Sequence, residues 1–270
     1  MNGPQRARGR IELRFAQVQG ASRLRHLAQE APLRALFPTV EPDEAPEAAI
    51  VNTGGGVVGG DRYSLDIEVE AGAALTITTP AAEKIYRSGG ESAEIVTHLR
   101  CGEGARLEWL PQETILFDGA RLRRRLEIDL SPNARFLGVE TILFGRRASG
   151  EFLNSGALRD AWTLCVGGRP IWADAIGLSG DIAAHRAGRF GIRDAAGYAT
   201  IVIAGPSAAA LLPRARDIAQ GAATLVNGVL LLRFLDSDAA RLRGAVIETL
   251  ATFRPSATGG RGSAPRLWLN

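Results

Sequence analysis

The sequence predicts a mainly β protein whose strands stack in two layers and wind like a β-helix, with two or three helices toward the C-terminus. Apolar and polar residues alternate in short segments over the first two thirds of the chain, which is typical of half-buried strands. Tight turns separate these segments and recur about every thirty residues. Apolar residues at helical spacing appear only late. No linker rich in Pro, Gly or Ser divides the chain, so we expect one domain over residues 1–270.

The repeat consists of four segments that each contain a strand, a tight turn and a second strand. The segments are residues 65–79, 94–110, 122–144 and 162–172, and their turns lie at 71–73, 101–104, 131–133 and 166–168. One segment alone would leave an apolar face in water. Neighbouring segments must therefore pile up into a layered or helical β-core.

Helices are predicted only in the last third. Pro213 bounds a short one near residues 214–220, and Ser237 is the expected N-cap of a longer one. On the longer helix, one face carries an apolar stripe formed by Leu242, Val246, Leu250 and Phe253. Residues 38–46 are acidic, bounded by prolines and predicted to be irregular.

Composition excludes several classes of protein. Hydrophobic residues make up 46% of the chain, but the apolar runs are far shorter than the ~18 residues of a membrane span. The N-terminus is too rich in arginine for a signal peptide, so we expect a cytoplasmic protein with no membrane partner. The net charge of +3 is too small to indicate nucleic-acid binding. Cys101 and Cys165 form no CxxC or Cys/His cluster, and we interpret both as small buried hydrophobes.

A glycine-rich loop at residues 52–61 matches the letters of a dinucleotide-binding motif but not the structural context that the motif requires. Gly54, Gly56 and Gly59 match G-x-G-x-x-G, but residues 65–70 alternate like a strand where that motif needs a helix. Strand, loop and strand predict a hairpin. Asp61 also stands where a P-loop needs lysine. A nucleotide-binding enzyme that uses the Gly54–Gly60 loop remains the alternative function, and it requires a helix after Gly60.

Catalytic and metal-binding patterns are absent from the sequence. His26, His98 and His185 lie far apart, and we expect His98 on the surface of a strand. No nucleophile elbow occurs. A polysaccharide-binding β-solenoid would show aromatic stripes, but aromatic residues are only 6% of the chain and not periodic. The densest basic cluster places Arg123 and Arg125 on the polar face of one strand, as a solvated charge ladder.

Two carboxylates stand in apolar surroundings. Glu113 lies in residues 109–117, and Glu140 lies in residues 136–144, where both strand faces are apolar. Burying an unpaired carboxylate costs several kcal/mol by rough estimate, so Glu140 needs a partner, a cation or a raised pKa. The candidate partners are Arg124, Arg146 and Arg147. Two interpretations stay open, a structural ion pair and a polar path lined by carboxylates.

Five blocks in this chain, taken together, resemble the UreD (UreH) family of urease accessory proteins. They are NTGGGVVGGD at 52–61, TTPAAEKIYRS at 78–88, LEWLPQETILF at 107–117, GRRASGE at 145–151 and PRLW at 265–268. The resemblance implies two packed sheets in a helix-like winding and a scaffold that is not an enzyme. It further implies direct binding of UreF, binding of the GTPase UreG through UreF, and binding of the urease apoprotein, so that nickel passes into urease.

Two departures from the family pattern are modest. Ser149 stands where methionine is common, and residues 29–33 replace a His-x-Gly-Pro-Leu run, which weakens any nickel role for an N-terminal histidine.

A nickel conduit should bind its ion weakly, because a tight site would trap it. Nickel prefers imidazole and thiolate ligands, so carboxylates and carbonyls suit transient binding, and we expect no permanently bound cofactor. The candidate residues of a transient nickel path are Asp61, Glu113, Glu140 and Glu151.

Six residues are candidates for partner binding. Tyrosine and arginine often anchor interfaces, which favours Tyr86 and Arg87, although an exposed arginine is commonly just solvated. The other candidates would form a UreF-binding element near the C-terminus, with core packing as the alternative; they are Leu242, Val246, Phe253 and Trp268.

Overall fold

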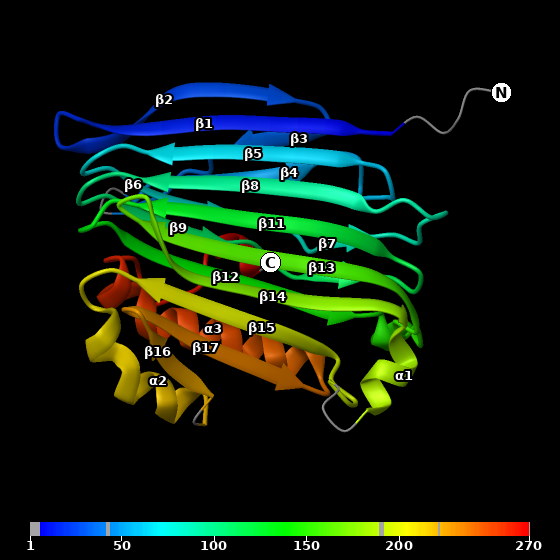
Figure 1. The fold of residues 1–270 in the computed structure, drawn as a ribbon. Coiled ribbons are helices and arrows are strands. Elements are labelled where there is room, and N and C mark those ends of the chain that lie inside the picture. The colour runs from blue at the N-terminus through cyan, green and yellow to red at the C-terminus, as the bar shows by residue number, and fades with distance from the viewer. Residues whose placement is uncertain (1–5, 42–43, 189–191, 221, 270) are drawn as a thin grey trace.

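The computed structural model describes residues 6–41, 44–188, 192–220 and 222–269. Two β-sheets stack face to face, and a long helix lies on the far side of the second sheet (Figure 1). The predicted fold, mainly β with two stacked layers that wind like a β-helix, is confirmed.

The first layer, sheet A, has seven strands in the order β14-β13-β11-β8-β5-β1-β2. Neighbours from β1 to β13 run parallel, whereas the edge strands β2 and β14 pair antiparallel. In chain order the strands are β1 (Arg8–Val18), β2 (Ala21–Glu30), β5 (Arg62–Val69), β8 (Ala93–Cys101), β11 (Arg121–Leu130), β13 (Ser155–Val166) and β14 (Arg169–Asp181).

The second layer, sheet B, has ten strands, eight of them in the order β16-β17-β15-β12-β9-β6-β4-β3. Two short strands extend it beside β12, which pairs with β10, while β10 pairs with β7. In chain order the strands are β3 (Leu33–Leu36), β4 (Glu47–Asn52), β6 (Ala74–Thr78), β7 (Glu83–Ile85), β9 (Arg106–Leu110), β10 (Thr114–Leu116), β12 (Arg135–Phe144), β15 (Gly197–Ala204), β16 (Ala223–Val226) and β17 (Val229–Asp236).

The chain winds by alternating between the two sheets. The turns after β5, β8 and β11 lead into β6, β9 and β12, and each strand pairs parallel with its counterpart from the next coil. The predicted hairpin around the glycine loop is wrong, because β4 belongs to sheet B and β5 to sheet A. Alternation in a sequence shows that one face of a strand is buried, but it does not show which strand is its neighbour. Of the four predicted segments, only 162–172 forms a hairpin, between β13 and β14.

Sheet B is covered on both faces. Phe136 and Ile142 of β12 point into the core between the sheets, whereas Leu137 and Val139 of the same strand point to a second core under the helix. This double coverage explains why residues 136–144 read as apolar on both faces. It also means that the polar side chains in the middle of β12, Glu140 and Thr141, are buried.

The helices lie in the last third of the chain, as predicted, where they alternate with strands β15 to β17. The described residues contain three α-helices: α1 (Ile182–Ala187), α2 (Leu212–Ile218) and α3 (Ala239–Ala257). Three short 3-10 turns accompany them: η1 (Arg147–Ser149), η2 (Ala208–Leu211) and η3 (Arg266–Trp268). The N-cap of α3 is Asp238 and not Ser237, because the Asp238 carboxylate accepts hydrogen bonds from the backbone N–H groups of Ala240 and Arg241.

The outer face of sheet A is the predicted charge ladder. Arg123 and Arg125 are exposed there, and His98 lies on the same surface with its Nδ1 3.0 Å from Glu127. Cys101 is buried as predicted, but Cys165 is only half-buried because it lies on the outer face of sheet A, where its register partner is the exposed Asp129. The described part of residues 38–46 is irregular. No helix in the described structure is long and apolar enough to cross a membrane.

The glycine loop packs too tightly for side chains at some positions, which generates a test. A Cβ on Gly59 would overlap the side-chain hydroxyl of Ser88 and the backbone carbonyl of Glu91. We expect Gly59→Ala to lower the free energy of unfolding by about 1–3 kcal/mol in urea titrations. Gly89→Ala is the control, because a Cβ there meets nothing, and it should stay within about 0.5 kcal/mol. Equal stability of the two variants would contradict this account of the loop.

Candidate functional site

A buried ion cluster lies between the two sheets. Arg124 of β11 points inward from sheet A, and its guanidinium contacts Glu140 of β12 at 2.6 Å and Asp160 of β13 at 2.8 Å. All three residues are at most 8% exposed. The expectation that Glu140 is buried and needs an arginine is confirmed, and the arginine is Arg124. Removing one partner from such a buried set costs about 3–5 kcal/mol, because a charge is left without compensation.

The cluster holds two carboxylates against one guanidinium. Burial raises the pKa of Glu140 to about 8; the charge of Arg124 lowers it and the charge of Asp160 raises it further. Arg124 binds Asp160 through two hydrogen bonds of 2.9 and 2.8 Å. One arginine therefore compensates Asp160 well and Glu140 incompletely, so Glu140 holds a proton at neutral pH.

A small cavity of about 20 Å³ adjoins this cluster. Such a volume has room for about one water molecule. Its walls include Glu140 and Asp160 at the buried end and Asp174, Ala175 and Tyr198 toward the surface. It lies where the edge strand β14 of sheet A passes β15 of sheet B (Figure 1). The buried carboxylates thus adjoin a small cavity whose lining mixes polar residues with apolar ones such as Trp162 and Trp172.

A second buried polar group lies in the coil formed by the glycine loop. The side-chain amide of Asn52 donates to both carboxylate oxygens of Glu83, at 3.3 and 3.2 Å. Burial raises the pKa of Glu83. The pKa of Tyr63 is raised to about 12, first by burial and then by the negative charges of Asp61 and Glu83. Two carboxylates and a phenol therefore share this region.

The two polar groups face the same space between the sheets. Thr114 of β10 accepts a hydrogen bond from Arg124 at 2.9 Å, so its side chain points at sheet A. Glu83 is the register partner of Thr114 on β7. Register partners on adjacent parallel strands lie about 4.8 Å apart and point to the same face. Polar side chains therefore follow one another between the sheets, from Glu83 through Thr114 to Glu140.

The four predicted nickel-path residues lie in four different environments. Asp61 is buried and accepts backbone N–H groups from Ala7 at 2.8 Å and Val58 at 2.9 Å, which closes the glycine loop. Glu140 lies between the sheets. Glu113 lies on the helix side of sheet B, paired with Arg243 of α3. Glu151 lies on the surface, paired with Arg146. The structure does not bring these four together, and their role in a nickel path stays a prediction.

Among the described residues, no group of three or more His, Cys, Asp or Glu side chains could hold a metal ion. The sequence interpretation also missed two buried acids, Asp160 and Glu108, and the half-buried Glu83. Glu83 and Asp160 face the space between the sheets, and Glu108 is paired with Arg254 of α3 at 2.7 Å. Glu108 lies between Leu107 and Trp109 on an alternating strand, so its sequence signal is that of an exposed acid. Asp160, by contrast, lies in phase with the buried Leu158 and Trp162, and this phase could have identified it as inward-facing.

The predicted partner residues Tyr86 and Arg87 lie at one end of the sheets in a surface cluster. The ring of Tyr86 meets that of Phe117 edge to face at 4.9 Å between centroids, and the guanidinium of Arg146 lies 4.1 Å over the same ring. Arg87 pairs with Asp118 at 2.9 Å, and the backbone N–H of Asp118 donates to Glu151 at 3.0 Å. Arg87 is exposed and Tyr86 half-exposed. Three of the blocks that carry the family resemblance therefore meet in one surface cluster.

The other four predicted partner residues are core residues. Leu242, Val246 and Phe253 of α3 are each 1% exposed and pack against sheet B. Trp268 is 4% exposed, and its indole N–H donates to Thr78 at 3.0 Å. Core packing, the alternative interpretation, accounts for their positions. A role in binding UreF stays a prediction.

Most backbone N–H groups of the glycine loop are already engaged. Gly54 donates to the Asn52 side chain at 2.9 Å, Val57 to Lys84 at 2.8 Å and Gly60 to Ser92 at 3.1 Å. A phosphate-binding loop needs such groups free. The segment after Gly60 is strand β5 and not the helix that the alternative function, a nucleotide-binding enzyme, requires.

Comparisons with known proteins agree with these features. The family model of the UreD urease accessory protein matches residues 7–269. Three relatives described as urease accessory protein UreD each cover 98% of this chain. They come from Rhodopseudomonas palustris (42% identical, 94% of the relative covered), Rhizobium rhizogenes (40%, 96%) and a Methylobacterium species (43%, 95%). The chain therefore belongs to the UreD family of urease accessory proteins.

Proposed function

We propose that this protein is a scaffold in urease maturation that binds UreF directly, UreG through UreF, and the urease apoprotein, and that it helps to deliver nickel to urease. Family membership supports a role in urease maturation. The assignment of these partners and of a non-catalytic role rests on the resemblance, and the proposed cytoplasmic location rests on the arginine-rich N-terminus. The observation that carries the nickel step is the pair of buried carboxylates, Glu140 and Asp160, which share one arginine beside a cavity that approaches the surface.

An incoming Ni²⁺ ion would displace the proton on Glu140. The ion enters, a proton leaves, and the carboxylate oxygens of Glu140 and Asp160 become its ligands while Arg124 lies within 3 Å of both. The guanidinium repels the cation and competes for the same oxygens, which keeps the binding weak. Oxygen ligands are also less favoured by nickel than imidazole or thiolate. Weak, proton-coupled binding is what a path needs, because the ion must leave again.

The polar groups between the sheets would extend this path. Glu83 is half-buried, accepts from Asn52, and lies one strand from Thr114. Asp61 contributes negative charge near Tyr63. We place Glu83, which sequence reasoning missed, beside Asp61 and Glu140 as a candidate member of the path. Glu113 and Glu151 lie outside the space between the sheets and are weaker candidates.

Proton binding by Glu140 should make stability depend on pH. Because the folded-state pKa of Glu140 is raised from 4.5 to about 8, the folded state binds a proton that the unfolded state has lost in this interval. Stability should therefore fall as pH rises from about 4.5 to 8. Glu140→Gln should remove this part of the pH dependence in urea titrations, whereas exposed Asp129→Asn should keep it. A pH profile that is the same in wild type and Glu140→Gln would contradict the assignment.

Nickel delivery is tested by the metal content of urease. We expect Glu140→Gln and Asp61→Asn to lower the nickel content of co-expressed urease at least severalfold, because the first removes a carboxyl group that can exchange its proton for the ion and the second removes a negative charge from the path. Nickel is measured by mass spectrometry of purified urease, after a pull-down confirms that the variant still binds UreF and apo-urease. Asp129→Asn, on the outer face of sheet A, is the matched control.

Normal nickel loading in both variants would exclude these residues from the path. Loss of partner binding in Asp129→Asn as well would point to general damage to the fold. A pull-down in which the wild-type protein fails to retain UreF or apo-urease would count against the proposed scaffold role itself.

A further inference from the structure

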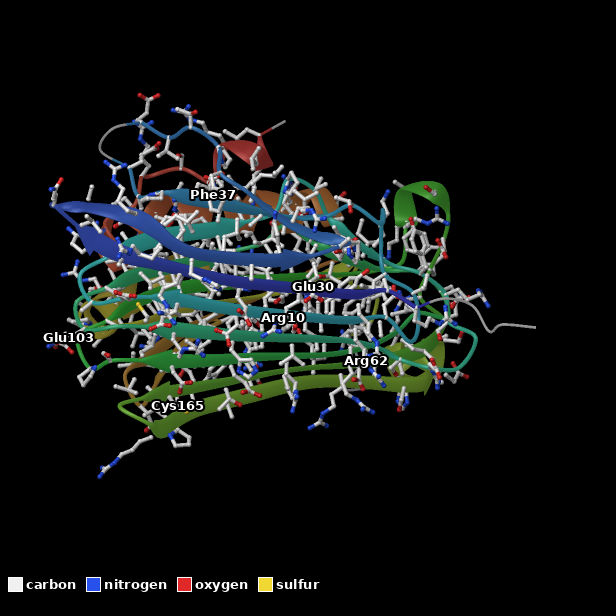
Figure 2. All side chains as sticks on the ribbon, turned by 90° about the horizontal axis from the view of Figure 1, so that it is seen from above. Arg10, Glu30, Phe37, Arg62, Glu103 and Cys165 are labelled. Carbon is white, nitrogen blue, oxygen red and sulfur yellow. The ribbon has the colours of Figure 1, made fainter. Side chains whose placement is uncertain are left out.

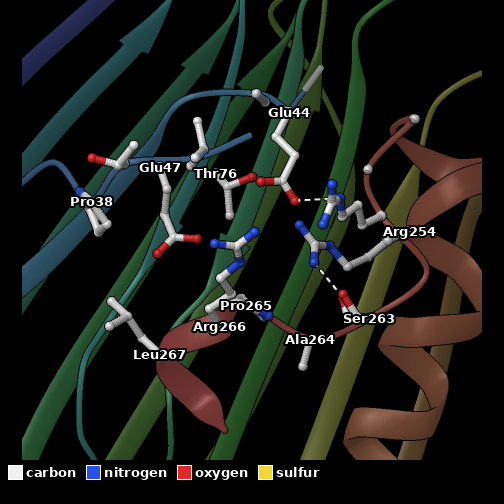
Figure 3. A pocket seen from close by; sticks show the side chains of 16 residues that line it. Pro38, Glu44, Glu47, Thr76, Arg254, Ser263, Ala264, Pro265, Arg266 and Leu267 are labelled. Atoms are coloured by element: carbon white, nitrogen blue, oxygen red, sulfur yellow. Dashed lines mark hydrogen bonds and ion pairs between the residues drawn. The ribbon is translucent and has the colours of Figure 1, made fainter. Parts of the chain in front are cut away.

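A surface pocket of about 400 Å³ lies between the loop before β4 and the C-terminal segment after α3. Figure 3 shows Pro38, Glu44 and Glu47 on one side of it and Arg254 and Arg266 on the other. It shares no lining residue with the cavity beside Glu140. A pocket of this size accommodates one large side chain together with part of the backbone that carries it.

Most charges at the pocket are paired within the protein. Arg261 contacts Glu44 at 2.7 Å, Arg266 contacts Glu41 at 2.7 Å, and Arg254 is held by the buried Glu108 at 2.7 Å. These pairs fix the walls and cancel one another. They leave no arginine on the lining that lacks a carboxylate.

Glu47 is the exception. Its side chain lies at the start of β4, and Figure 3 shows its carboxylate pointing into the pocket. Within the described part of the chain it has no hydrogen-bond or ion-pair partner, although it is only partly exposed. Burial raises its pKa, and the charges of Arg254 and Arg266 oppose that rise. A half-buried carboxylate that neither arginine contacts directly is only partly compensated, and an incoming cation in direct contact would offset the remaining cost.

Apolar side chains border the pocket. Leu36 and Phe37 are 56% and 40% exposed and directly precede the lining residue Pro38. Leu267 belongs to the lining, and Leu269, two residues further, is 66% exposed. Figure 2 shows Phe37 on the same side of the molecule as the C-terminal turn. Exposed large apolar residues around a concave site with a polar centre are the usual arrangement of a protein docking site.

We propose that this surface, formed by residues 36–41, 44–47 and 259–269, docks a segment of another protein that presents an arginine or lysine flanked by aliphatic residues. The basic side chain enters the pocket and pairs with Glu47, and the aliphatic neighbours cover Leu36, Phe37 and Leu269. Charge complementarity selects the cation, because the single unpaired charge on the lining is negative. An acidic segment would meet Glu47 with like charge.

The proposal is tested with a fluorescein-labelled peptide, Gly-Leu-Leu-Arg-Leu-amide, and its twin in which uncharged citrulline replaces arginine. Binding to the full-length protein is followed by fluorescence polarisation. We expect saturable binding of the arginine peptide and about tenfold weaker binding of the citrulline twin. Citrulline carries no charge, so its complex lacks the charge-assisted hydrogen bond between the peptide and Glu47. Glu47→Gln should weaken the arginine peptide about tenfold and leave the twin unchanged. Glu248→Gln, an exposed acid on α3, is the matched control and should change neither.

Leu36→Ser separates the apolar contribution, since it should weaken both peptides alike. Equal affinity of the two peptides, insensitivity to Glu47→Gln, or no saturable binding at millimolar concentration would each overturn the proposal. The other possible occupant of the surface is a second copy of this chain, and light scattering tests for it by measuring the oligomeric state. If the protein is a dimer that Leu36→Ser converts to a monomer, the surface is an interface between two copies of this chain and the proposal is wrong.

Discussion

The structure depends on one constraint: every strand of the coils must bury an apolar face against the opposite sheet. Each strand of sheet A can cover its apolar face only against sheet B, and each coil can satisfy its backbone N–H and C=O groups only through the coils beside it. The parallel register from β5 through β8 and β11 to β13 meets both demands at once. Because neither sheet is stable without the other, the space between them is fixed in width and shut off from water.

The enclosed space between the sheets changes the protonation of the carboxylates that lie in it. A carboxylate on the outer face of sheet A is solvated and contributes little, as the ladder that includes Glu94 and Asp129 shows. Glu140, on the inner face, shares Arg124 with Asp160 and retains a proton for lack of a second cation. The same residue type thus becomes a proton-exchanging group or a solvated charge according to the face of the strand on which it lies.

The second face of sheet B serves a different purpose. Helix α3 and the C-terminal segment cover it with apolar side chains and two ion pairs, Arg243 with Glu113 and Arg254 with Glu108. These pairs join the end of the chain to strands that precede it by more than a hundred residues. The C-terminal segment is thereby held beside the loop before β4, and the pocket around Glu47 forms between them. The proposed docking surface is a consequence of this closure.

The sequence by itself determined the strand-rich character, the late helices, the exposed faces of Arg123 and Arg125, and the burial of Glu140, because all of these follow from local alternation and composition. The glycine loop was identified as structural for the same reason. The alternating residues after Gly60 predict a strand, β5, and a nucleotide-binding loop would need a helix there. Only the tertiary structure decided which strands are neighbours, that β4 and β5 lie in different sheets, and that Glu83, Thr114 and Arg124 face one space. Pairing between coils joins residues about thirty positions apart, and a periodic sequence looks the same for every choice of partner. Which charges meet across the sheets, such as Arg124 of β11 with Glu140 of β12, therefore depends on how the two sheets stack and cannot be read from local sequence.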